Sequence, residues 1–515
     1  MSILSHALKQ AVVGARGYDG AKMGRMYSDW FAHATSSDAE IRANFRRLLD
    51  RSRDLERNSD YWRGFLIALE NNVVGALRRD LRMDAGEWLP ASKNKRPVWQ
   101  VDYLANTKIE TAWEDWGKKG IASICGRYSW RTVKNLLVRT LARDGNVFIR
   151  KIRGPSAKNK NGFALQLWEI DHLDLKRFET LQGGGQIRFG IETDADGRPT
   201  AYYMSSRHSG DGYFGQGSQE FVRVPASDIV HLFVPERAEQ SIGVPWCVSA
   251  ITRLRQLGAF EEAAVIAARI GAANMGFFTK TAGPGGEIGT WTGDTNAAGN
   301  GIVEAQPGTM EELPLGWDVS AWKRDYPNIA TGDFRKAMLR GMATGLGRSY
   351  TTIGNDLESV SFASSRVGLF EEREGYKALQ LFMEENAYQP VFGDWLEMSM
   401  AAGVLNFPQG KFDKLNRPIF KGRRWAMIDP YKEIQALKTA IALRVNSRRG
   451  WMDEQGLDVE DVFADNLADE QLAADMDLSL TPPDPEPETS AGDPAADPDD
   501  PESITPATKP AKKNA

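Results

Sequence analysis

Residues Tyr326 to Glu374 read YPNIATGDFRKAMLRGMATGLGRSYTTIGNDLESVSFASSRVGLFEERE. Apolar residues recur in the first part of this segment at steps of three and four, which predicts an amphipathic helix. The residues of this apolar stripe are Phe334, Met338, Leu339, Met342 and Leu346. The cationic residues that lie off the stripe are Arg335, Lys336 and Arg340.

A polar loop of about 14 residues, from Arg348 to Ser361, follows the predicted helix, and a second helix is predicted to begin near Ala363. Loops of this length are uncommon inside compact domains unless they are functional. The loop carries no nucleophile, no set of metal ligands and no phosphate cradle. Its small polar side chains allow close approach to another molecule, which is typical of a contact surface rather than of a catalyst.

The composition indicates a globular chain of two or three packed regions, because 515 residues exceed the size of one common domain. No apolar run approaches the roughly 18 to 20 residues that a membrane helix needs. The N-terminal sequence lacks the apolar core of a signal peptide, so we expect the chain to remain in the cytoplasm where it is made. Two cysteines, Cys125 and Cys247, cannot form a disulfide framework.

The net charge of −5 arises from the last residues of the chain. Residues 481–515 contain eight acidic residues, three lysines and nine of the 24 prolines. Such a segment cannot bury enough apolar surface to offset the entropy of ordering, so we predict a disordered acidic tail. The remainder of the chain is close to neutral and shows no overall basic character of the kind expected for a conventional DNA-binding domain.

Helical patterns precede strand patterns in residues 1–240, which predicts an α+β module. Ser37 to Glu40 resemble a capping box, and Asn58 or Ser59 is expected to restart the helix. Further helices are predicted at 103–124 and 129–142. The predicted strands are 147–149, 165–168, 187–192 and 201–204, with a hairpin turn at Asp196-Gly197.

The second half of the chain is predicted to be mostly helical. An Ala-rich helix is expected from Pro245 to about Asn274, with a length on the order of 40 Å. A Gly- and Thr-rich region follows, with a strand predicted at Ile302-Val303. Helix is expected from the region of Ala363 to Met400, and again over 429–475, where Asp429 and Pro430 have the types expected at a helix start.

Motifs for catalysis or metal binding are weak. Glu169, Asp171 and Asp174 could form a carboxylate cluster for acid–base or metal chemistry, but no histidine or Gly-rich partner accompanies them in sequence, so a structural ion-pair role is favoured. The five histidines lack the spacing of metal ligands. The glycines at 183–185 and 283–286 lack the Lys-Ser/Thr ending of a P-loop. These observations predict no catalytic residues, no cofactor and no metal site.

Several segments together resemble the lambda-type phage portal protein family. They are Arg57–Tyr61 with Asn71–Gly75, Arg143–Phe148, Gly190–Tyr202, Val224–His231 continuing to Trp246, and the block 326–374. Each segment is unspecific alone, but their order and spacing make the resemblance specific. It covers most of residues 38–465 and leaves out the tail and the Gly-rich stretch 281–300.

The resemblance implies the portal fold, a ring-forming α+β architecture of wing, stem, clip and crown. The implied regions are wing at 1–243, first stem helix at 244–275, clip at 276–327, second stem helix at 328–346, tunnel loop at 347–362, long helix and return to the wing at 363–428, helical crown at 429–480, and disordered tail at 481–515. The α–insert–α pattern predicted around residue 300 agrees with a stem hairpin whose tip is the clip.

The resemblance implies that the polar loop lines a DNA channel. The implied tunnel-loop residues are Arg348, Ser349, Tyr350, Thr351, Thr352, Asn355, Asp356, Glu358 and Ser361, and the stem residues are Arg335, Lys336 and Arg340. A ring multiplies each charge in its lumen, and each neutralised phosphate releases counterions and tightens binding. A polar, weakly acidic loop therefore suits a duplex that has to slide. Arg348 is the exception, for which pairing with Asp356 or Glu358, or contact with phosphates, stays open.

The function implied is a non-catalytic dodecameric ring at one capsid vertex, through which double-stranded DNA is packaged and ejected. The implied partners are other copies of the chain, DNA, terminase, a head–tail adaptor and the major capsid protein, with no membrane. The expected location is the virion, preceded by the host cytoplasm during assembly. Two alternatives remain: a metal-dependent DNA-processing enzyme that uses the carboxylates at 169–174, and a capsid shell or scaffold protein.

Overall fold

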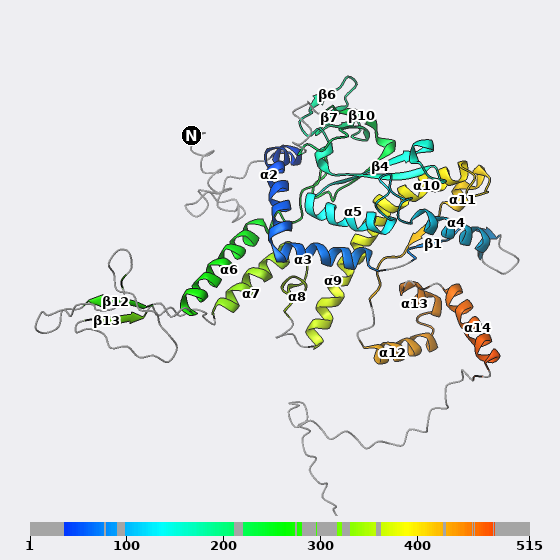
Figure 1. Cartoon of the computed structure of the whole chain (residues 1–515). Helices are drawn as coiled ribbons and strands as arrows, with labels where there is room; N and C mark the ends of the chain where they lie inside the picture. The colour runs from blue at the N-terminus through cyan, green and yellow to red at the C-terminus, as the bar shows by residue number, and fades with distance from the viewer. Residues whose placement is uncertain are drawn as a thin grey trace, which may run out of the picture. The chain divides into compact units, whose positions relative to one another are not determined.

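The structure is a computed structural model that forms two compact units, residues 1–425 and 426–515, which are described separately. The residues that it describes are 35–76, 79–89, 98–210, 220–272, 276–280, 295, 317–321, 330–356, 362–425, 429–455, 457, 459–476 and 478. The predicted strand at 302–303 and the predicted disordered tail at 481–515 lie outside these residues. The described part of the chain is mixed α and β, as predicted (Figure 1).

The first unit opens with helices and short strands. They are α2 (Ser37–Asn58), α3 (Asp60–Leu69), the π-helix η3 (Glu70–Val74), β1 (Leu81–Met83), β2 (Gly86–Leu89), β3 (Val98–Val101), α4 (Tyr103–Trp116) and α5 (Trp130–Asp144). Ser36, not Ser37, caps α2, since its hydroxyl accepts the Ala39 amide at 3.3 Å. Ser59 restarts the helix as expected. α4 ends at Trp116, earlier than predicted, because turns that include Gly120 at φ 92° follow it.

Two antiparallel sheets follow in the chain. Their strands are β4 (Val147–Arg153), β5 (Phe163–Trp168), β6 (Glu179–Thr180), β7 (Gln186–Arg188), β8 (Ile191–Thr193), β9 (Pro199–Met204), β10 (Val222–Pro225) and β11 (Ile229–Leu232). One sheet has the order β11-β4-β5 and the other β10-β9-β8-β7-β6. The predicted turn at Asp196-Gly197 joins β8 to β9, with Gly197 at φ 82°, a conformation that glycine adopts without strain.

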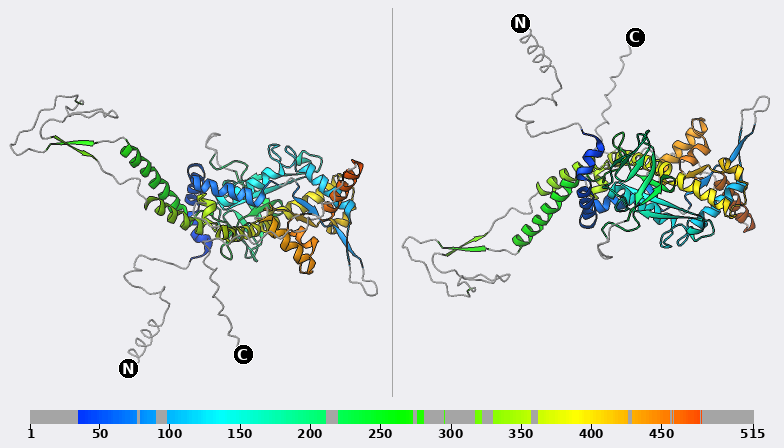
Figure 2. Two further views of the ribbon diagram at one scale, coloured as in Figure 1. Left: turned by 90° about the horizontal axis from the view of Figure 1, so that it is seen from below. Right: turned by 90° about the horizontal axis from the view of Figure 1, so that it is seen from above.

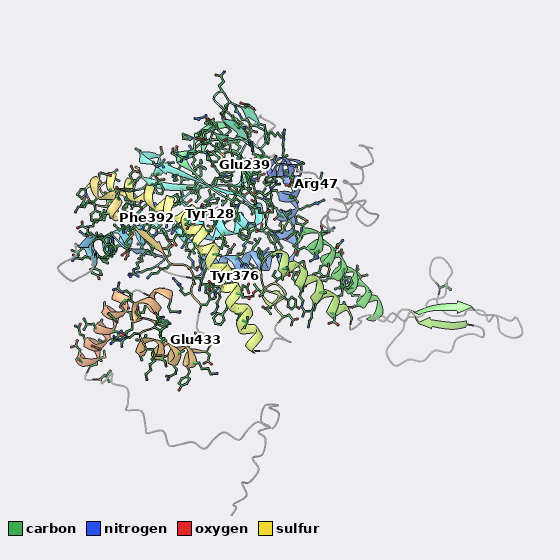
Figure 3. All side chains as sticks on the ribbon, turned by 180° about the vertical axis from the view of Figure 1, so that it is seen from behind. Arg47, Tyr128, Glu239, Tyr376, Phe392 and Glu433 are labelled. Carbon is green, nitrogen blue, oxygen red and sulfur yellow. The ribbon has the colours of Figure 1, made fainter. Side chains whose placement is uncertain are left out.

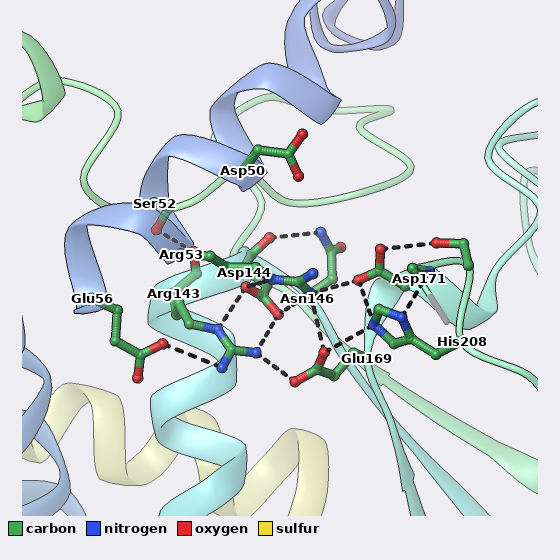
Figure 4. A network of polar contacts seen from close by, with 12 residues as sticks. Asp50, Ser52, Arg53, Glu56, Arg143, Asp144, Asn146, Glu169, Asp171 and His208 are labelled. Atoms are coloured by element: carbon green, nitrogen blue, oxygen red, sulfur yellow. Dashed lines mark hydrogen bonds and ion pairs between the residues drawn. The ribbon is translucent and has the colours of Figure 1, made fainter. Parts of the chain in front are cut away.

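The 3₁₀ turns of this region are η4 (Gly154–Ala157), η5 (Ile170–His172) and η7 (Ala226–Asp228). They connect or end strands, and η5 carries Asp171 directly after β5. The chain therefore reverses direction at the end of β5, and this turn brings acidic side chains toward α2 and α5 (Figure 4).

Two helices far apart in sequence form an antiparallel pair. They are α6 (Ile251–Ala272) and α7 (Ala330–Gly345), which lie side by side in Figures 1 and 2. The hydroxyl of Ser249 donates to the Gly345 carbonyl at 3.0 Å, and the rings of Phe260 and Phe334 are 5.0 Å apart. Between the helices in sequence, β12 (Gly276–Lys280) pairs with β13 (Trp317–Ala321). α6 begins later than predicted, because residues 247–250 form a turn.

The chain then returns to the N-terminal helices. The elements are α8 (Tyr350–Gly354), α9 (Phe362–Met383), the π-helix η8 (Glu384–Tyr388), α10 (Gln389–Ala401), η9 (Gln409–Lys411), α11 (Phe412–Leu415) and β14 (Pro418–Phe420). α9 begins within one residue of the predicted start. β14 pairs with β1, Phe420 opposite Leu81. A core of aromatic rings holds α4 and α10 together, since the ring centroid of Trp113 of α4 lies 4.9 Å from that of Trp395 and 5.4 Å from that of Phe392, both on α10. Figure 3 labels Phe392 on this helix.

The second unit is helical, as predicted for 429–475. Its described helices are α12 (Pro430–Ala442), α13 (Arg448–Glu454) and α14 (Val459–Asp475). Asp429 caps α12 by accepting the Lys432 amide at 3.3 Å, which confirms the predicted start. Among the described residues of this unit, only Val459 and Ala473 are buried apolar residues, while large side chains such as Tyr431 and Val445 are exposed.

No helix within the described residues has both the length and the apolar composition that crossing a bilayer requires.

Candidate functional site

The segment after α7 is more ordered than the sequence predicts. Ser349 caps α8 by accepting the Thr352 amide at 3.2 Å, and Asn355, at φ 48°, ends the helix. The predicted irregular loop therefore begins with one short helix, because it contains both a cap and a residue type that tolerates the left-handed conformation. Glu358 and Ser361 lie outside the described residues.

A buried carboxylate on α9 holds this helix in place. Glu372 is 8% exposed and accepts hydrogen bonds from the hydroxyls of Ser349 at 2.7 Å and Thr352 at 2.8 Å. It also accepts from the hydroxyl of Tyr376, one helical turn further along α9, at 3.0 Å. Burial and then the charge of Glu372 raise the pKa of Tyr376, so its hydroxyl stays protonated and donates. We call Ser349, Thr352, Glu372, Tyr376 and Arg348 the α8 junction.

Arg348 contacts the α8 junction through an aromatic ring. Its guanidinium lies 4.1 Å from the ring centroid of Tyr376, a cation–π geometry. Burial lowers the pKa of Arg348, while Tyr376 and Glu372 oppose that shift. Its Nε is buried without a hydrogen-bond partner among the described residues. The guanidinium of Arg348 thus contacts the Tyr376 ring, whereas Tyr350 and Lys336 are the described partners of Asp356.

Asp356 connects α8 to α7 instead. Its carboxylate accepts the Tyr350 hydroxyl at 2.7 Å and lies 3.4 Å from the Lys336 ammonium. The guanidinium of Arg340 lies 5.4 Å from the Tyr350 ring centroid. Of the three cations predicted to lie off the apolar stripe of α7, Arg340 therefore contacts α8 and Lys336 contacts Asp356, just after it. Arg335 is exposed, as is Asn355.

The apolar stripe of α7 packs as predicted over most of its length. Leu339 and Met342 are buried, Met338 and Leu346 pack partly against the core, and Phe334 remains 47% exposed beside Phe260. α6 approaches α7 closely at Gly341, where an added Cβ would lie 2.0 Å from the Arg253 guanidinium. A side chain at position 341 would therefore require the flexible guanidinium of Arg253 to move.

The α8 junction contains residues that the sequence interpretation missed. Glu372 and Tyr376 lie four residues apart on a helix and so share one face. That spacing was a signal for a joint role, but their partners Ser349 and Thr352 lie about 20 residues earlier in the chain. Of the predicted loop residues, Ser349, Tyr350, Thr352 and Asp356 take part in the described contacts, and Thr351 adds a hydroxyl contact to Ser349 at 2.9 Å.

Arginine side chains form ion pairs with the carboxylates of Glu169 and Asp171 (Figure 4). Arg53 of α2 lies 2.8 Å from Asp144, 3.2 Å from Glu169 and 2.6 Å from Asp171. Arg143 of α5 lies 2.6 Å from Glu169. We call these residues, together with Arg46 and His208, the arginine–carboxylate network.

The arginines explain the electrostatics of this network. Burial raises the pKa of Asp171, but Arg46 and Arg53 outweigh it and lower that pKa to about 2. Glu169, Asp171 and His208 are near enough together to hold a metal ion, with ligand atoms within 4.8 Å. The guanidinium groups already neutralise these carboxylates. Asp174 is not part of this cluster, and its carboxylate accepts the Lys176 amide at 3.3 Å. The network therefore joins α2, α5 and η5 as a structural element, and the metal-dependent alternative loses its ligands.

The chain belongs to the lambda family of phage portal proteins, whose family model matches residues 23–380. A "Probable portal protein" of Halomonas phage phiHAP-1 is 32% identical over 456 residues, which cover 87% of this chain and 85% of that protein. Portal protein B of Escherichia phage lambda is 20% identical over 491 residues, covering 87% of this chain and 88% of its own. The portal protein of Escherichia phage N15 is 20% identical over 509 residues, covering 90% and 91%.

Solved structures show weaker likeness. A chain in a structure described as "Neck of empty GTA particle computed with C6 symmetry" aligns with 79% of this chain and 94% of its own at 13% identity, with a TM-score of 0.43. A chain in a virion structure of a native gene transfer agent particle aligns with 67% of this chain and 84% of its own at 14% identity, with a TM-score of 0.37.

The family assignment settles the class of the protein. It is a phage portal protein and a component of the virion, and portal proteins are structural rather than enzymatic. The resemblance stated from the sequence is thereby confirmed, and the enzyme alternative is excluded together with the shell or scaffold alternative.

Proposed function

We propose that the chain assembles into a dodecameric ring at one capsid vertex and forms the channel through which double-stranded DNA is packaged and ejected. The observation that carries this proposal is the antiparallel α6–α7 pair, followed directly by α8 and α9, in a chain of the lambda portal family. The contacts Ser249 to Gly345 and Phe260 to Phe334 set this pair in register. A helical hairpin followed by a short polar segment suits a channel wall that ends in a constriction.

The regions of the proposed portal follow the order implied by the sequence. They are wing at 1–243, stem helices at 244–275 and 328–346, clip at 276–327, tunnel loop at 347–362, long helix and return to the wing at 363–428, and crown at 429–480. The pairing of β14 with β1 supports the return, because it joins residues 418–420 to the N-terminal part.

Exposed apolar side chains support assembly with further copies. Val265 and Ile266 on α6 are 58% and 48% exposed, and Val367 on α9 is 61% exposed. α12 and α14 of the second unit add Tyr431 and Phe463. Exposed large apolar side chains mark interaction surfaces where they form contiguous patches. Neighbouring subunits of a ring would cover them.

The tunnel loop is proposed to face the DNA. Asn355 is exposed. Lys336 of α7 is paired with Asp356, so its positive charge is partly neutralised. Weak net attraction to phosphates allows a duplex to slide, because each additional phosphate contact tightens binding through counterion release. Terminase, a head–tail adaptor and the major capsid protein are proposed as partners at the ring surfaces, with assembly in the host cytoplasm.

Electron microscopy of the purified protein tests the proposal. Rotational averages of negatively stained particles are expected to show rings with a central hole, and a cryo-microscopy reconstruction is expected to place residues 347–362 at the narrowest point of the bore. Single subunits, closed shells, or a bore lined at its narrowest point by another segment would contradict it.

A further inference from the structure

Four helices of the first unit form a row with two different ends. α6 contacts α7 through the hydrogen bond from Ser249 to the Gly345 carbonyl. α7 contacts α8 where Arg340 lies against the Tyr350 ring, and α8 is bonded to Glu372 of α9. α6 and α9 are therefore the end helices of the row, as Figure 1 shows, and each has one face that its neighbours leave exposed.

The exposed face of α6 lies opposite its buried residues Leu254 and Leu257. Exposed residues that recur at steps of three and four form this outer face; they are Arg255, Ala259, Glu262, Ile266 and Arg269. Residues at these steps share one side of a helix. None of the three charged side chains has an ion-pair or hydrogen-bond partner among the described residues. The outer face of α6 is thus mainly cationic around a small apolar centre.

The exposed face of α9 lies opposite its buried residues Tyr376 and Met383. Exposed residues again recur at steps of three and four; they are Val367, Glu371, Glu374, Ala378, Leu381 and, in η8, Glu385. The two large apolar side chains of this outer face are 61% and 59% exposed. Only one of its three acids, Glu374, has an ion-pair partner among the described residues, Lys377 at 2.6 Å. The outer face of α9 is thus mainly acidic.

The charges on the two outer faces are opposite and equally spaced. On α6 the order is positive, negative, positive, at steps of seven residues. On α9 the unpaired acids Glu371 and Glu385 are fourteen residues apart, as the two arginines of α6 are, which is about 21 Å along an α-helix. Lys377 lies beside the midpoint of the α9 face, and Glu262 is the midpoint of the α6 face. When the faces are superposed, each charge of α6 therefore meets an opposite charge of α9.

We propose that the outer face of α9 in one copy docks against the outer face of α6 in the next copy, an inference that rests on the proposed ring. Rings of many copies are built from head-to-tail contacts, in which each copy presents two different surfaces. Docking removes Val367, Leu381 and Ile266 from water, which favours association. Complementary charges fix the register and disfavour contacts between two α6 faces or two α9 faces.

Two charge-reversal variants of the full-length protein test this interface. Arg255→Glu with Arg269→Glu makes the α6 face acidic, and Glu371→Arg with Glu385→Arg makes the α9 face basic. All four side chains are exposed, so folding is expected to be unchanged. In each variant alone, neighbouring copies present like charges to one another, so we expect the concentration needed for ring formation to rise by about tenfold or more. Analytical ultracentrifugation and negatively stained grids measure the ring fraction.

An equimolar mixture of the two variants provides the rescue. Each acidic α6 face then meets a basic α9 face, and each unaltered α6 face meets an unaltered α9 face, so alternating rings are expected at the wild-type concentration. The control is Arg47→Glu with Arg51→Glu, which reverses two exposed arginines on α2 and is expected to assemble as wild type does.

The outcomes separate this interface from the ring itself. The interface is overturned if either reversal variant assembles as wild type does, if the mixture stays unassembled, or if the α2 control loses as much assembly as the reversal variants. Rings formed by the wild type in those cases still support the proposed function. A wild type that forms no rings contradicts the proposed function and the interface with it.

Discussion

The α8 junction and the arginine–carboxylate network are both buried polar clusters, but their hydrogen bonds differ in kind. In the network, the guanidiniums of Arg53 and Arg143 bond to the carboxylates of Asp144 and Glu169. In the junction, one carboxylate, Glu372, is held by three hydroxyls, and the nearby cation Arg348 stacks on a ring. Bonds between two charged groups are stronger than those from neutral donors.

This difference separates a rigid part of the chain from an adjustable one. The network connects α2, α5 and the end of β5, elements that share the main body of the first unit (Figure 4). The junction holds a helix of only five residues that flanks the proposed DNA-facing loop. We expect α8 to open locally at a lower free-energy cost than the body, because few residues and mainly neutral donors hold it.

The largest effect on stability is expected from the network. Arg53→Ala leaves the fully buried carboxylates of Asp144 and Asp171 without one partner, so the free energy of unfolding should fall by about 3 kcal/mol. Denaturant unfolding of the purified protein measures this. Arg57→Ala is the control on the same helix, since the Arg57 side chain is 67% exposed and pairs with exposed Asp54, and a loss below about 0.5 kcal/mol is expected. Equal losses in both variants would contradict the rigid role.

Acid should weaken the network through Asp171. Its folded pKa of about 2 lies below the ordinary value of about 3.9, so the stability that it contributes is present above that ordinary value and is lost as the pH falls toward 2. As the pH falls from 5 to 2, we expect the free energy of unfolding of Asp171→Asn to fall by about 2 kcal/mol less than that of wild type. The measurement is the free energy of unfolding from pH 5 to pH 2, compared with wild type. Parallel curves would show that Asp171 titrates normally.

A smaller, local effect is expected at the junction. Glu372→Gln keeps the shape of the side chain but removes its charge, so three hydroxyls lose a charged acceptor. We expect faster hydrogen exchange at residues 350–354, by about fivefold for a loss of about 1 kcal/mol, with little change in global unfolding. Glu374→Gln, two residues away with a 70% exposed side chain, is the matched control. Unchanged exchange in Glu372→Gln would show that α8 is held by packing alone.

Substitutions in the proposed tunnel loop are expected to affect folding least. They are expected to affect function specifically. Asp356→Lys combined with Glu358→Lys should leave ring assembly intact and reduce the DNA packaged per head, because a ring of added lysines binds phosphates and slows sliding. Asp356→Asn with Glu358→Gln removes the acids without adding cations and should reduce packaging less. Heads with a normal DNA content in the lysine variant would mean that this segment does not line the channel.

Local sequence signals predicted most of the elements. The apolar stripe from Phe334 to Met342 predicted α7, and Asp429 with Pro430 predicted the start of α12. The Asp196-Gly197 turn was read correctly, because turn residues, caps and helical periodicity act over a few neighbouring residues. The predictions were wrong at two helix ends. Two adjacent serines could cap α2, and Ser36 rather than Ser37 does so, while α4 ends at Trp116, before the predicted end at 124.

The family, the α+β class and the order of helices and strands were determined by the amino-acid sequence alone, because they depend on residue types and their spacing. Tertiary structure decided which charges meet. Only folding brings Arg53 to Asp171 and Glu372 to Ser349. Such contacts join segments that are tens to hundreds of residues apart, and their burial, which sets both bond strength and pKa, does not exist until the chain has packed.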